Sequence, residues 1–324
     1  MTKLTRRTML AGLSAAAALR PDRAFAAWPE RSITLVHGLA PGGGVDVTAR
    51  LIADGLSRRL GQQIVVEPKP GAAATLGAAH VARATPDGYT FFFVSGSHSV
   101  TAAMYKSLPY HPIDDFSIVG QATDVPFMLV TYAGHPIRTV PDLIRIAKAS
   151  PNPLLCGIPG VGSSHHLLME HFSRLAGVKI QLVPFRGGNL ALNELLGKRL
   201  DFLVDPPIAL LGQIRGGQLQ AIGVTSDTRF PTLPEVATIA EAGFPGFSVT
   251  SWMGVIGPAN LPAPVVERLN REISQLVAEP ATAERIRALG SEPKSGTPAQ
   301  FKERMAGDLT RWTKVVADAG IEKI

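Results

Sequence analysis

The segment Ser32-Ile-Thr-Leu-Val-His-Gly-Leu-Ala-Pro-Gly-Gly-Gly-Val-Asp46 reads as an apolar strand followed by a glycine-rich turn. A helix is predicted directly after it, because Ala49, Ile52, Leu56 and Leu60 recur at intervals of three or four residues. Consecutive glycines let the backbone approach a ligand closely, and the free N–H groups of a helix N-terminus favour a negative charge. The turn is therefore a candidate anion-binding loop. A plain turn is the alternative, and glycine-rich turns between a strand and a helix more often have only that role.

The same order of strand, polar loop and helix recurs farther along the chain. The continuous apolar run Tyr89–Val94 predicts a buried strand that ends at Ser95, Ser97 and His98. Strands that alternate with helices form parallel sheets, and ligands bind at the carboxyl ends of such strands. The loops at 40–46 and 95–98 are therefore expected to face one crevice. Capping of the next helix is the alternative role for Ser95 and Ser97.

Two series of strands and helices are separated by extended segments. Segment 116–132, broken near Asp124-Val-Pro126, and a strand over 247–258 are the candidates for crossing between two domains. Helices are predicted over 71–83, 140–149, 163–176, 189–197, 207–215, 263–278, 281–289 and 298–319. One short helix is predicted between 232 and 246. Further strands are predicted over 63–67, 154–158, 179–185, 202–205 and 220–226. In the last helix, Phe301, Met305, Leu309, Trp312 and Val316 form an apolar stripe that we interpret as core rather than as a cofactor site.

The first 26 residues have the composition of an export signal. Lys3, Arg6 and Arg7 are basic, 9–19 is an apolar run of small residues, and Ala24-Phe-Ala26 offers a cleavage site. The run is shorter than the roughly 20 residues that span a bilayer. The adjacent arginines favour the twin-arginine route, with a general secretory signal as the alternative.

Most of the positive charge lies in that leader. It holds five of the 32 Lys and Arg and one of the 26 Asp and Glu, so 27 minus 25 leaves about +2 rather than +6. We find no basic face with interleaved aromatic residues, and nucleic acid is therefore not an expected partner. The single cysteine, Cys156, lies in the apolar run 154–158 and is interpreted as a buried, inert thiol.

Several short motifs occur in an order that resembles one protein family. They are Gly38-Leu-Ala-Pro-Gly-Gly-Gly-Val-Asp46, Leu60-Gly-Gln-Gln-Ile-Val-Val-Glu-Pro-Lys-Pro-Gly-Ala72, Pro86-Asp-Gly-Tyr-Thr90, Leu108-Pro-Tyr110, Asp115-Phe116, Val224-Thr-Ser226, Leu233-Pro-Glu-Val236, Glu241-Ala-Gly243, Ser251-Trp252 and the closing segment 315–321. Each motif alone is weak, but their collinear order is specific. From about residue 28 to 324 the chain resembles the Bug proteins, the substrate-binding components of tripartite tricarboxylate transporters.

The resemblance implies an α/β periplasmic binding protein of type II-like architecture. Each lobe would be a mostly parallel sheet with helices on both faces, and two crossing strands would form the hinge. Lobe 1 would comprise 28–127 and 252–324, and lobe 2 would comprise 128–251. The implied ligand is a small carboxylate (a dicarboxylate, tricarboxylate, amino acid or aromatic acid), held largely by backbone N–H groups and bridging waters. The implied partner is a membrane permease, and we expect a monomer without a cofactor.

The expected ligand contacts come from loops at strand ends. They are Ala40, Pro41, Gly42, Gly43, Gly44, Asp46, Ser95, Ser97, His98, Gly162, Ser163, Ser164, His165, Phe185, Arg186, Gly187 and Asp205. Asp46 is expected to order its loop rather than to touch an anion. The chain departs from the family pattern at Gly38-Leu39, where Pro-Phe is usual, and at Pro206, where Asn is usual. Arg186 stands where Lys is usual and would grip a carboxylate bidentately if it points inward.

Metal binding and catalysis are not expected. His165 and His166 are adjacent, so on a helix they point about 100° apart, and no third ligand has suitable spacing. An exported α/β hydrolase is the rival class, but no Gly-x-Ser-x-Gly motif or pair of carboxylates suits such chemistry. A periplasmic sensor that serves a signalling partner is a third interpretation.

Overall fold

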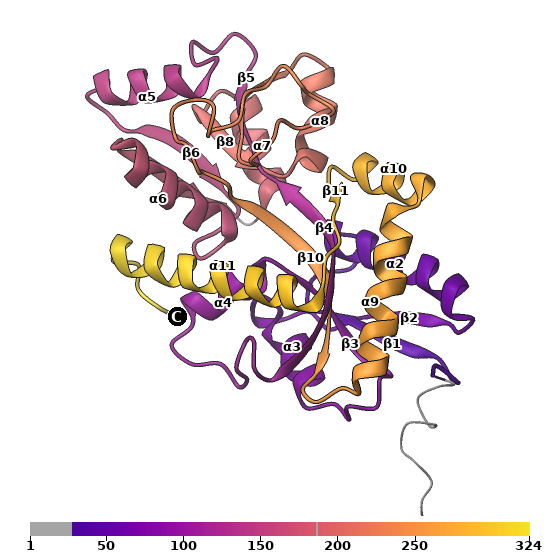
Figure 1. Ribbon diagram of the computed structural model, residues 1–324. Coiled ribbons are helices and arrows are strands. Elements are labelled where there is room, and N and C mark those ends of the chain that lie inside the picture. Colours follow the sequence, from indigo (N-terminus) through magenta and orange to yellow (C-terminus); the bar gives the residue numbers. More distant parts are fainter. Residues whose placement is uncertain (1–27, 186) are drawn as a thin grey trace, which may run out of the picture.

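The computed structural model describes residues 28–185 and 187–324, which form two sheets in two halves of the molecule (Figure 1). The predicted leader over 1–26 lies outside the described residues. The first sheet has the order β11-β4-β10-β3-β1-β2. Its strands are β1 (Ile33–His37), β2 (Ile64–Pro68), β3 (Thr90–Ser95), β4 (Phe116–Pro126), β10 (Thr250–Pro258) and β11 (Glu292–Pro293). The second sheet has the order β7-β6-β8-β5-β9. Its strands are β5 (Met128–Tyr132), β6 (Leu154–Ile158), β7 (Ile180–Pro184), β8 (Phe202–Asp205) and β9 (Leu219–Val224).

Helices connect the strands of both sheets. Those that accompany the first sheet are α2 (Gly44–Leu60), the short 3-10 turn η2 (Ala72–Ala74), α3 (Thr75–Ala82), α4 (Ser97–Met104), α9 (Ala263–Ala278), α10 (Pro280–Ala288) and α11 (Pro298–Ala319). Those that accompany the second are α5 (Val140–Ala149), α6 (Ser164–Ala176), α7 (Gly188–Leu196) and α8 (Pro207–Arg215). None of the helices in the described part of the chain has both the length and the apolar character needed to cross a membrane. We call the half with the first sheet lobe 1 and the half with the second sheet lobe 2.

Only part of each sheet is parallel, which corrects the expectation of mostly parallel sheets. β1 pairs in parallel with β2 and β3, and β6 pairs in parallel with β7 and β8. β10 runs antiparallel to β3 and β4, and β5 runs antiparallel to β8 and β9. The strands that enter from the other lobe run against their neighbours, because the chain returns through the hinge in the opposite direction. The carboxyl ends of the parallel strands still gather at one edge of each sheet.

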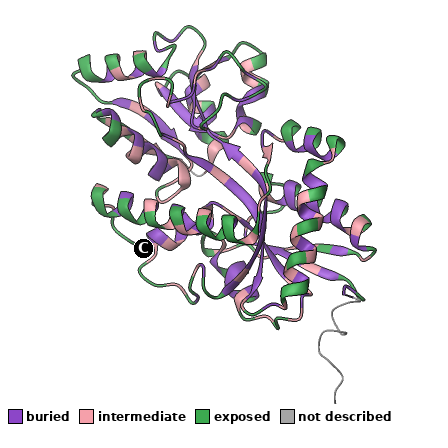
Figure 2. Ribbon diagram, in the orientation of Figure 1, coloured by how far each residue is buried: buried purple, intermediate pink, exposed green. Residues whose placement is uncertain are grey.

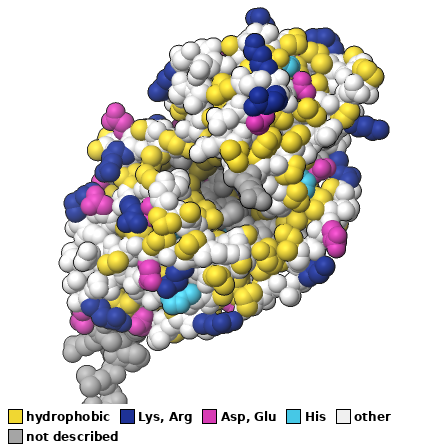
Figure 3. Space-filling view, turned by 180° about the vertical axis from the view of Figure 1, so that it is seen from behind, with side chains coloured by type: hydrophobic (Ala, Val, Ile, Leu, Met, Phe, Trp, Pro, Cys, Tyr) yellow, Lys and Arg dark blue, Asp and Glu magenta, His cyan; other side chains and the backbone are white. Residues whose placement is uncertain are grey.

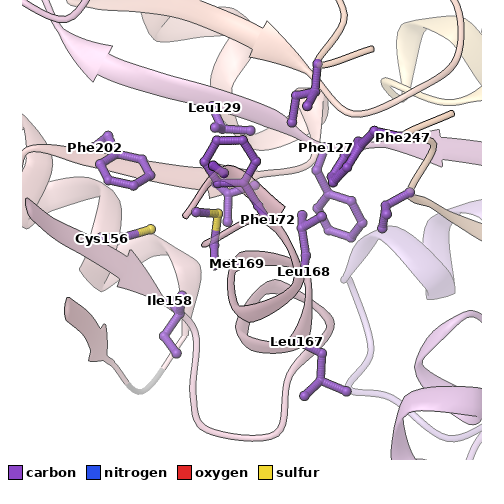
Figure 4. Close-up of a cluster of buried hydrophobic side chains, with 14 of the residues drawn as sticks. Phe127, Leu129, Cys156, Ile158, Leu167, Leu168, Met169, Phe172, Phe202 and Phe247 are labelled. Carbon is purple, nitrogen blue, oxygen red and sulfur yellow. The ribbon is translucent and has the colours of Figure 1, made fainter. Parts of the chain in front are cut away.

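Alternate side chains of the strands enter different hydrophobic clusters, so both faces of each sheet are covered. In β3, Phe91 and Phe93 pack with α2 and α9, whereas Phe92 and Val94 pack with α3 and α11. The corresponding core of lobe 2 contains Phe202, Phe172 and Cys156 (Figure 4). The interior strands are buried and the outer helix faces exposed (Figure 2). Burial raises the pKa of the Cys156 thiol, in agreement with the predicted inert cysteine.

Helix α11 belongs to both lobes. Its predicted apolar stripe is core, but Phe301 and Met305 join the lobe 1 cluster, whereas Trp312 and Val316 join the cluster that fills lobe 2. Val100 and Met104 of α4 also enter the lobe 2 cluster. The two lobes are therefore joined by a shared apolar core as well as by the crossing strands.

Two local predictions are wrong. The predicted helix over 71–83 begins only at Thr75, because Ala72, Ala73 and Ala74 all have positive φ (45°, 53° and 74°) and form η2. Contacts hold this left-handed turn: Thr101 Oγ1 donates to the Ala73 carbonyl at 3.2 Å, and a Cβ on Gly38 would lie 2.4 Å from Ala74 Cβ. The short helix expected between 232 and 246 is absent from the structure, in which these described residues form turns. The break in segment 116–132 falls at Phe127, near the predicted position.

Candidate functional site

The glycine-rich loop of lobe 1 ends in an uncapped helix. Gly42 has φ +78°, and Gly43 is the N-cap of α2 without a side chain that could accept from the first N–H groups. The backbone from Ala40 to Gly44 is exposed, whereas Asp46 is only 4% exposed. The loop thus presents unbonded N–H donors at a positive helix end, as an anion site requires.

Asp46 orders this loop. Its Oδ2 accepts from the Gly42 N–H at 2.9 Å and from Arg50 Nε at 3.0 Å, and its Oδ1 lies 2.9 Å from His37 Nε2. The Arg50 guanidinium, followed by the Gly42 N–H and His37, holds the pKa of this carboxyl far below its usual range, against the opposing effect of burial. Asp46 therefore stays ionised and faces its own loop, which is the role that the sequence favoured.

The second lobe 1 loop lies beside the first. A small pocket of about 10 Å³ is lined by Gly38, Leu39 and Val45 and also by Ser95, Ser97 and His98, so residues of both loops border one small space. The N-cap of α4 is Gly96, which has no side-chain cap, so neither serine caps this helix. Instead, the Ser95 and Ser97 hydroxyl oxygens lie 2.8 Å apart.

His98 lies in the core of lobe 1. Its Nε2 is 2.9 Å from the Pro112 carbonyl, and its ring stacks on Tyr110 and meets Phe116 edge-on. Desolvation by this apolar surrounding lowers the pKa of His98 to about 4, so the ring is neutral near pH 7. These contacts hold the imidazole in place, and His98 also lines the small pocket beside Ser95 and Ser97. Its expected role as a ligand contact stays a prediction.

The lobe 2 loop before α6 repeats the lobe 1 arrangement. Gly162 has φ +77° and donates its N–H to His166 Nδ1 at 3.0 Å. Ser163 is the N-cap, and its Oγ accepts from the His166 N–H at 3.2 Å and donates to the Gly160 carbonyl at 2.8 Å. Ser164 and His165 are the first two residues of α6 after this N-cap, and the Ser163 hydroxyl accepts from neither of their N–H groups.

His165 reaches across to the end of β8. Its Nε2 lies 3.1 Å from Asp205 Oδ1, and its ring meets Phe127 of the crossing segment edge-on at 5.1 Å. Asp205 Oδ2 lies so close to the start of α7 that a Cβ on Gly188 would be 2.6 Å away. The pair thus ties the start of α6 to the end of β8. His165 Nδ1 has no partner among the described residues, and no hydroxyl is therefore placed there as the nucleophile of a Ser–His–Asp triad.

The loop after β7 supplies another uncapped helix start. Phe185 donates its N–H to the Ile158 carbonyl at 2.9 Å, which ties this loop to the end of β6. Gly187, with φ +115°, is the N-cap of α7 and has no side-chain cap. Arg186 lies outside the described residues. Among residues 28–185 and 187–324, no cluster of three or more His, Cys, Asp or Glu side chains has the arrangement of a metal site.

Exposed aliphatic side chains lie near the starts of five helices, of which α2, α6 and α7 follow the loops described above. They are Val47 of α2, Leu76 of α3, Val161 before α6, Leu190 of α7 and Ile208 of α8, with exposed fractions from 39% to 62%. Figure 3 shows a hollow between the lobes with hydrophobic side chains gathered around it and most charged side chains farther out. These residues were not predicted from the sequence, although an apolar residue near the start of a helix was an available signal.

A larger pocket lies elsewhere and is less suited to an anion. About 610 Å³ in volume, it is bounded by β4, β11, α11 and the segment 226–231. Its arginines are bonded within the protein, Arg304 to Thr250 and Arg229 to Glu241. The helix start that borders it, that of α11, is already closed by a capping box of Thr297 and Gln300. The uncapped helix starts of the two lobes are therefore the better candidate site.

Comparison with known proteins agrees with this architecture. Residues 48–321 match the family described as "Tripartite tricarboxylate transporter family receptor". The chain belongs to this receptor family. A UPF0065 protein of Pseudomonas sp. (strain P51), from the tcbD-tcbE intergenic region, is 36% identical over 321 residues, which are 98% of this chain and 96% of the relative.

Two solved structures resemble this receptor over nearly its whole length. The periplasmic binding protein BugD is 32% identical with a TM-score of 0.76, and Rpa4515 of R. palustris, solved with adipate, is 33% identical with a TM-score of 0.80. Each alignment covers 92% of this chain and all of the other. The predicted relationship to the Bug proteins and the two-lobed α/β fold are confirmed, and the chain is a solute-binding receptor of the tripartite tricarboxylate transporter family.

Proposed function

We propose that this receptor works in the periplasm, captures a small carboxylate between its lobes and delivers it unchanged to the permease of a tripartite tricarboxylate transporter. The observation that carries this proposal is the set of helix starts at the strand ends of both lobes. In α2, α4 and α7 the N-cap is a glycine without a side-chain cap. Their first N–H groups are thus left for a ligand, and each helix end favours negative charge.

The surrounding side chains suit an organic anion rather than a bare inorganic one. Exposed aliphatic residues lie in the first turns of α2 and α7, Val47 and Leu190, and near the starts of α3, α6 and α8, Leu76, Val161 and Ile208. Carboxylate oxygens would accept from the N–H groups while the carbon skeleton contacts the aliphatic side chains. The relative Rpa4515, whose structure contains adipate, has this combination of two carboxylates and a methylene chain as its ligand.

A thermal-shift screen of the purified mature protein tests this proposal. Adipate, shorter dicarboxylates, tricarboxylates, amino acids and aromatic acids would be compared with adipamide, which has the same skeleton without charge. Ligand at 100 times its dissociation constant should stabilise the protein by about 2.7 kcal/mol. Product analysis after incubation should recover the acid unchanged. Stabilisation by the amide alone, or conversion of the acid, would contradict the proposal.

A substitution at Gly44 separates anion recognition from fold stability. Gly44 is the first residue of α2, and a Cβ there would meet no atom within 4 Å. Gly44→Asp places a negative charge at the helix start, which stabilises the helix but repels a carboxylate. We expect carboxylate binding to weaken at least tenfold while the unliganded melting temperature is maintained. Gly44→Asn, of the same size without the charge, is the control and should bind more tightly than Gly44→Asp.

A further inference from the structure

The lobes touch at a point that neither the crossing strands nor the shared core explains. Gly290, directly after α10 of lobe 1, is buried against the start of α8 in lobe 2. A Cβ on Gly290 would lie 2.5 Å from the backbone nitrogen of Ile208 and 3.1 Å from its Cα. Figure 1 shows α10 beside α8, with α11, α4 and α6 on the opposite side of the crossing strands. The contact thus closes the side of the molecule away from the shared core.

Two independent constraints act on Gly290. Its φ of +69° is left-handed and completes the end of α10, where Gly290 donates its N–H to the Arg287 carbonyl at 2.9 Å and Ser291 donates to Ile286 at 3.2 Å. The approach of Ile208 is the second constraint, and it comes from the other lobe. Because the neighbouring atoms are backbone, no side chain can rotate away to make room.

The segment that Gly290 contacts is part of the candidate site. Pro207 and Ile208 begin α8 only two and three residues after Asp205, the partner of His165. A displacement of the α8 start would therefore move the lobe 2 part of the candidate site, which includes Asp205 and His165. We propose that Gly290 is the contact point at which the start of α8 packs against lobe 1 when the lobes are together, and that the absence of a Cβ permits this approach.

The proposal predicts that a Cβ at position 290 holds the lobes apart on this side. Gly290→Asn adds the Cβ, and asparagine tolerates left-handed φ better than other residues with a side chain, so that backbone strain is kept small. The matched control is Gly177→Asn. Gly177 ends α6 with φ +61° and an equivalent pair of backbone hydrogen bonds, but a Cβ there would meet no atom within 4 Å.

Distance measurement between spin labels tests this contact between the lobes without any ligand. Exposed positions on the two contacting helices, Glu284 of α10 and Arg215 of α8, would be changed to cysteine and labelled. The native Cys156 is buried and would not react. We expect a longer label distance in Gly290→Asn than in the parent protein or in Gly177→Asn. Identical distance distributions in all three proteins would overturn the proposal.

Two further readouts separate lobe separation from misfolding and from the proposed function. Circular dichroism and melting should show that Gly290→Asn is folded, and if it is not, Gly290→Ala with the control Gly177→Ala would replace the pair. For a carboxylate that binds the parent protein, the dissociation constant should rise about tenfold in Gly290→Asn and little in Gly177→Asn. If no carboxylate binds the parent protein, the proposed function fails, but the label distances still decide the role of Gly290.

Discussion

In the loop before α2, Gly42 has φ +78° and donates its N–H to the side chain of Asp46, four residues later; in the loop before α6, Gly162 has φ +77° and donates to His166, also four residues later. Both acceptors are the third residue of their helix. The two lobes thus share one backbone geometry at the start of a helix. The side chains that hold this geometry differ in kind.

The lobe 1 loop is held by charge and leaves its helix uncapped. Asp46 is ionised and is shared by Gly42, His37 and Arg50. The lobe 2 loop is held by neutral groups. Burial lowers the pKa of His166, and the Ser163 hydroxyl accepts from the His166 N–H. The start of α2 therefore has no side chain that accepts from its first N–H groups, whereas at the start of α6 the Ser163 hydroxyl accepts one of them.

Removing the charged acceptor should have the largest effect. Asp46→Ala leaves the Gly42 N–H and buried His37 without their acceptor, and breaking a buried pair on one side is strongly destabilising. We expect the free energy of unfolding to fall by about 3 kcal/mol, measured by urea denaturation with an unchanged m-value.

The matched control for Asp46→Ala lies two turns farther along the same helix. Asp54 also pairs with an arginine four residues later, Arg58, but both side chains are more than half exposed. Asp54→Ala should therefore cost less than about 1 kcal/mol. Equal losses in the two variants would show that Asp46 is no more than a surface ion pair and would remove the basis of the comparison.

Much of the fold follows from local sequence signals. The bounds of α5 and α11 agree with the helices predicted over 140–149 and 298–319. Each helix begins after a capping threonine with a proline close behind it, Thr139-Val-Pro141 and Thr297-Pro298, which is a local start signal of the sequence. The left-handed turn at 72–74 was not predictable. An alanine-rich segment favours a helix, and the contacts that override this preference come from Gly38 and Thr101.

The site was predictable as a set of loops but not as a set of contacts. Glycines and serines at strand ends located the helix starts. His98 lines the pocket beside Ser97, but the contacts of its ring with Tyr110 and Phe116, which lie 12 and 18 residues later in the chain, were not predictable. The pair of His165 and Asp205 spans 40 residues. Such pairings depend on which strands become neighbours, and a single sequence does not contain that information.

Removing the lobe 2 cap should have an intermediate effect. Ser163→Ala loses the acceptor for the His166 N–H and the donor to Gly160, and loss of an N-cap costs about 1 kcal/mol. Ser163→Gly should cost only a few tenths of a kcal/mol, because glycine is a tolerated N-cap and lobe 1 has Gly43 at this position. If glycine proved as costly as alanine in urea denaturation, the equivalence of the two loops would be contradicted.

The smallest expected effect is a difference in how the two loops respond to acid. The pKa of His166 is lowered from 6.5 by burial, with Glu170 acting in the opposite direction. As the pH falls, His166 in the unfolded chain therefore binds a proton before His166 in the folded protein does. This residue leaves the free energy of unfolding unchanged above pH 6.5 and lowers it as the pH falls below 6.5 toward the folded pKa. Protonated Nδ1 cannot accept from Gly162, whereas Asp46 remains ionised and keeps the Gly42 bond. In amide NMR spectra between pH 7 and about 5, the Gly162 resonance should move and that of Gly42 should not. His166→Asn, whose amide does not titrate, should abolish the Gly162 shift, and parallel shifts of both glycines would show that the two loops are held by the same kind of group after all.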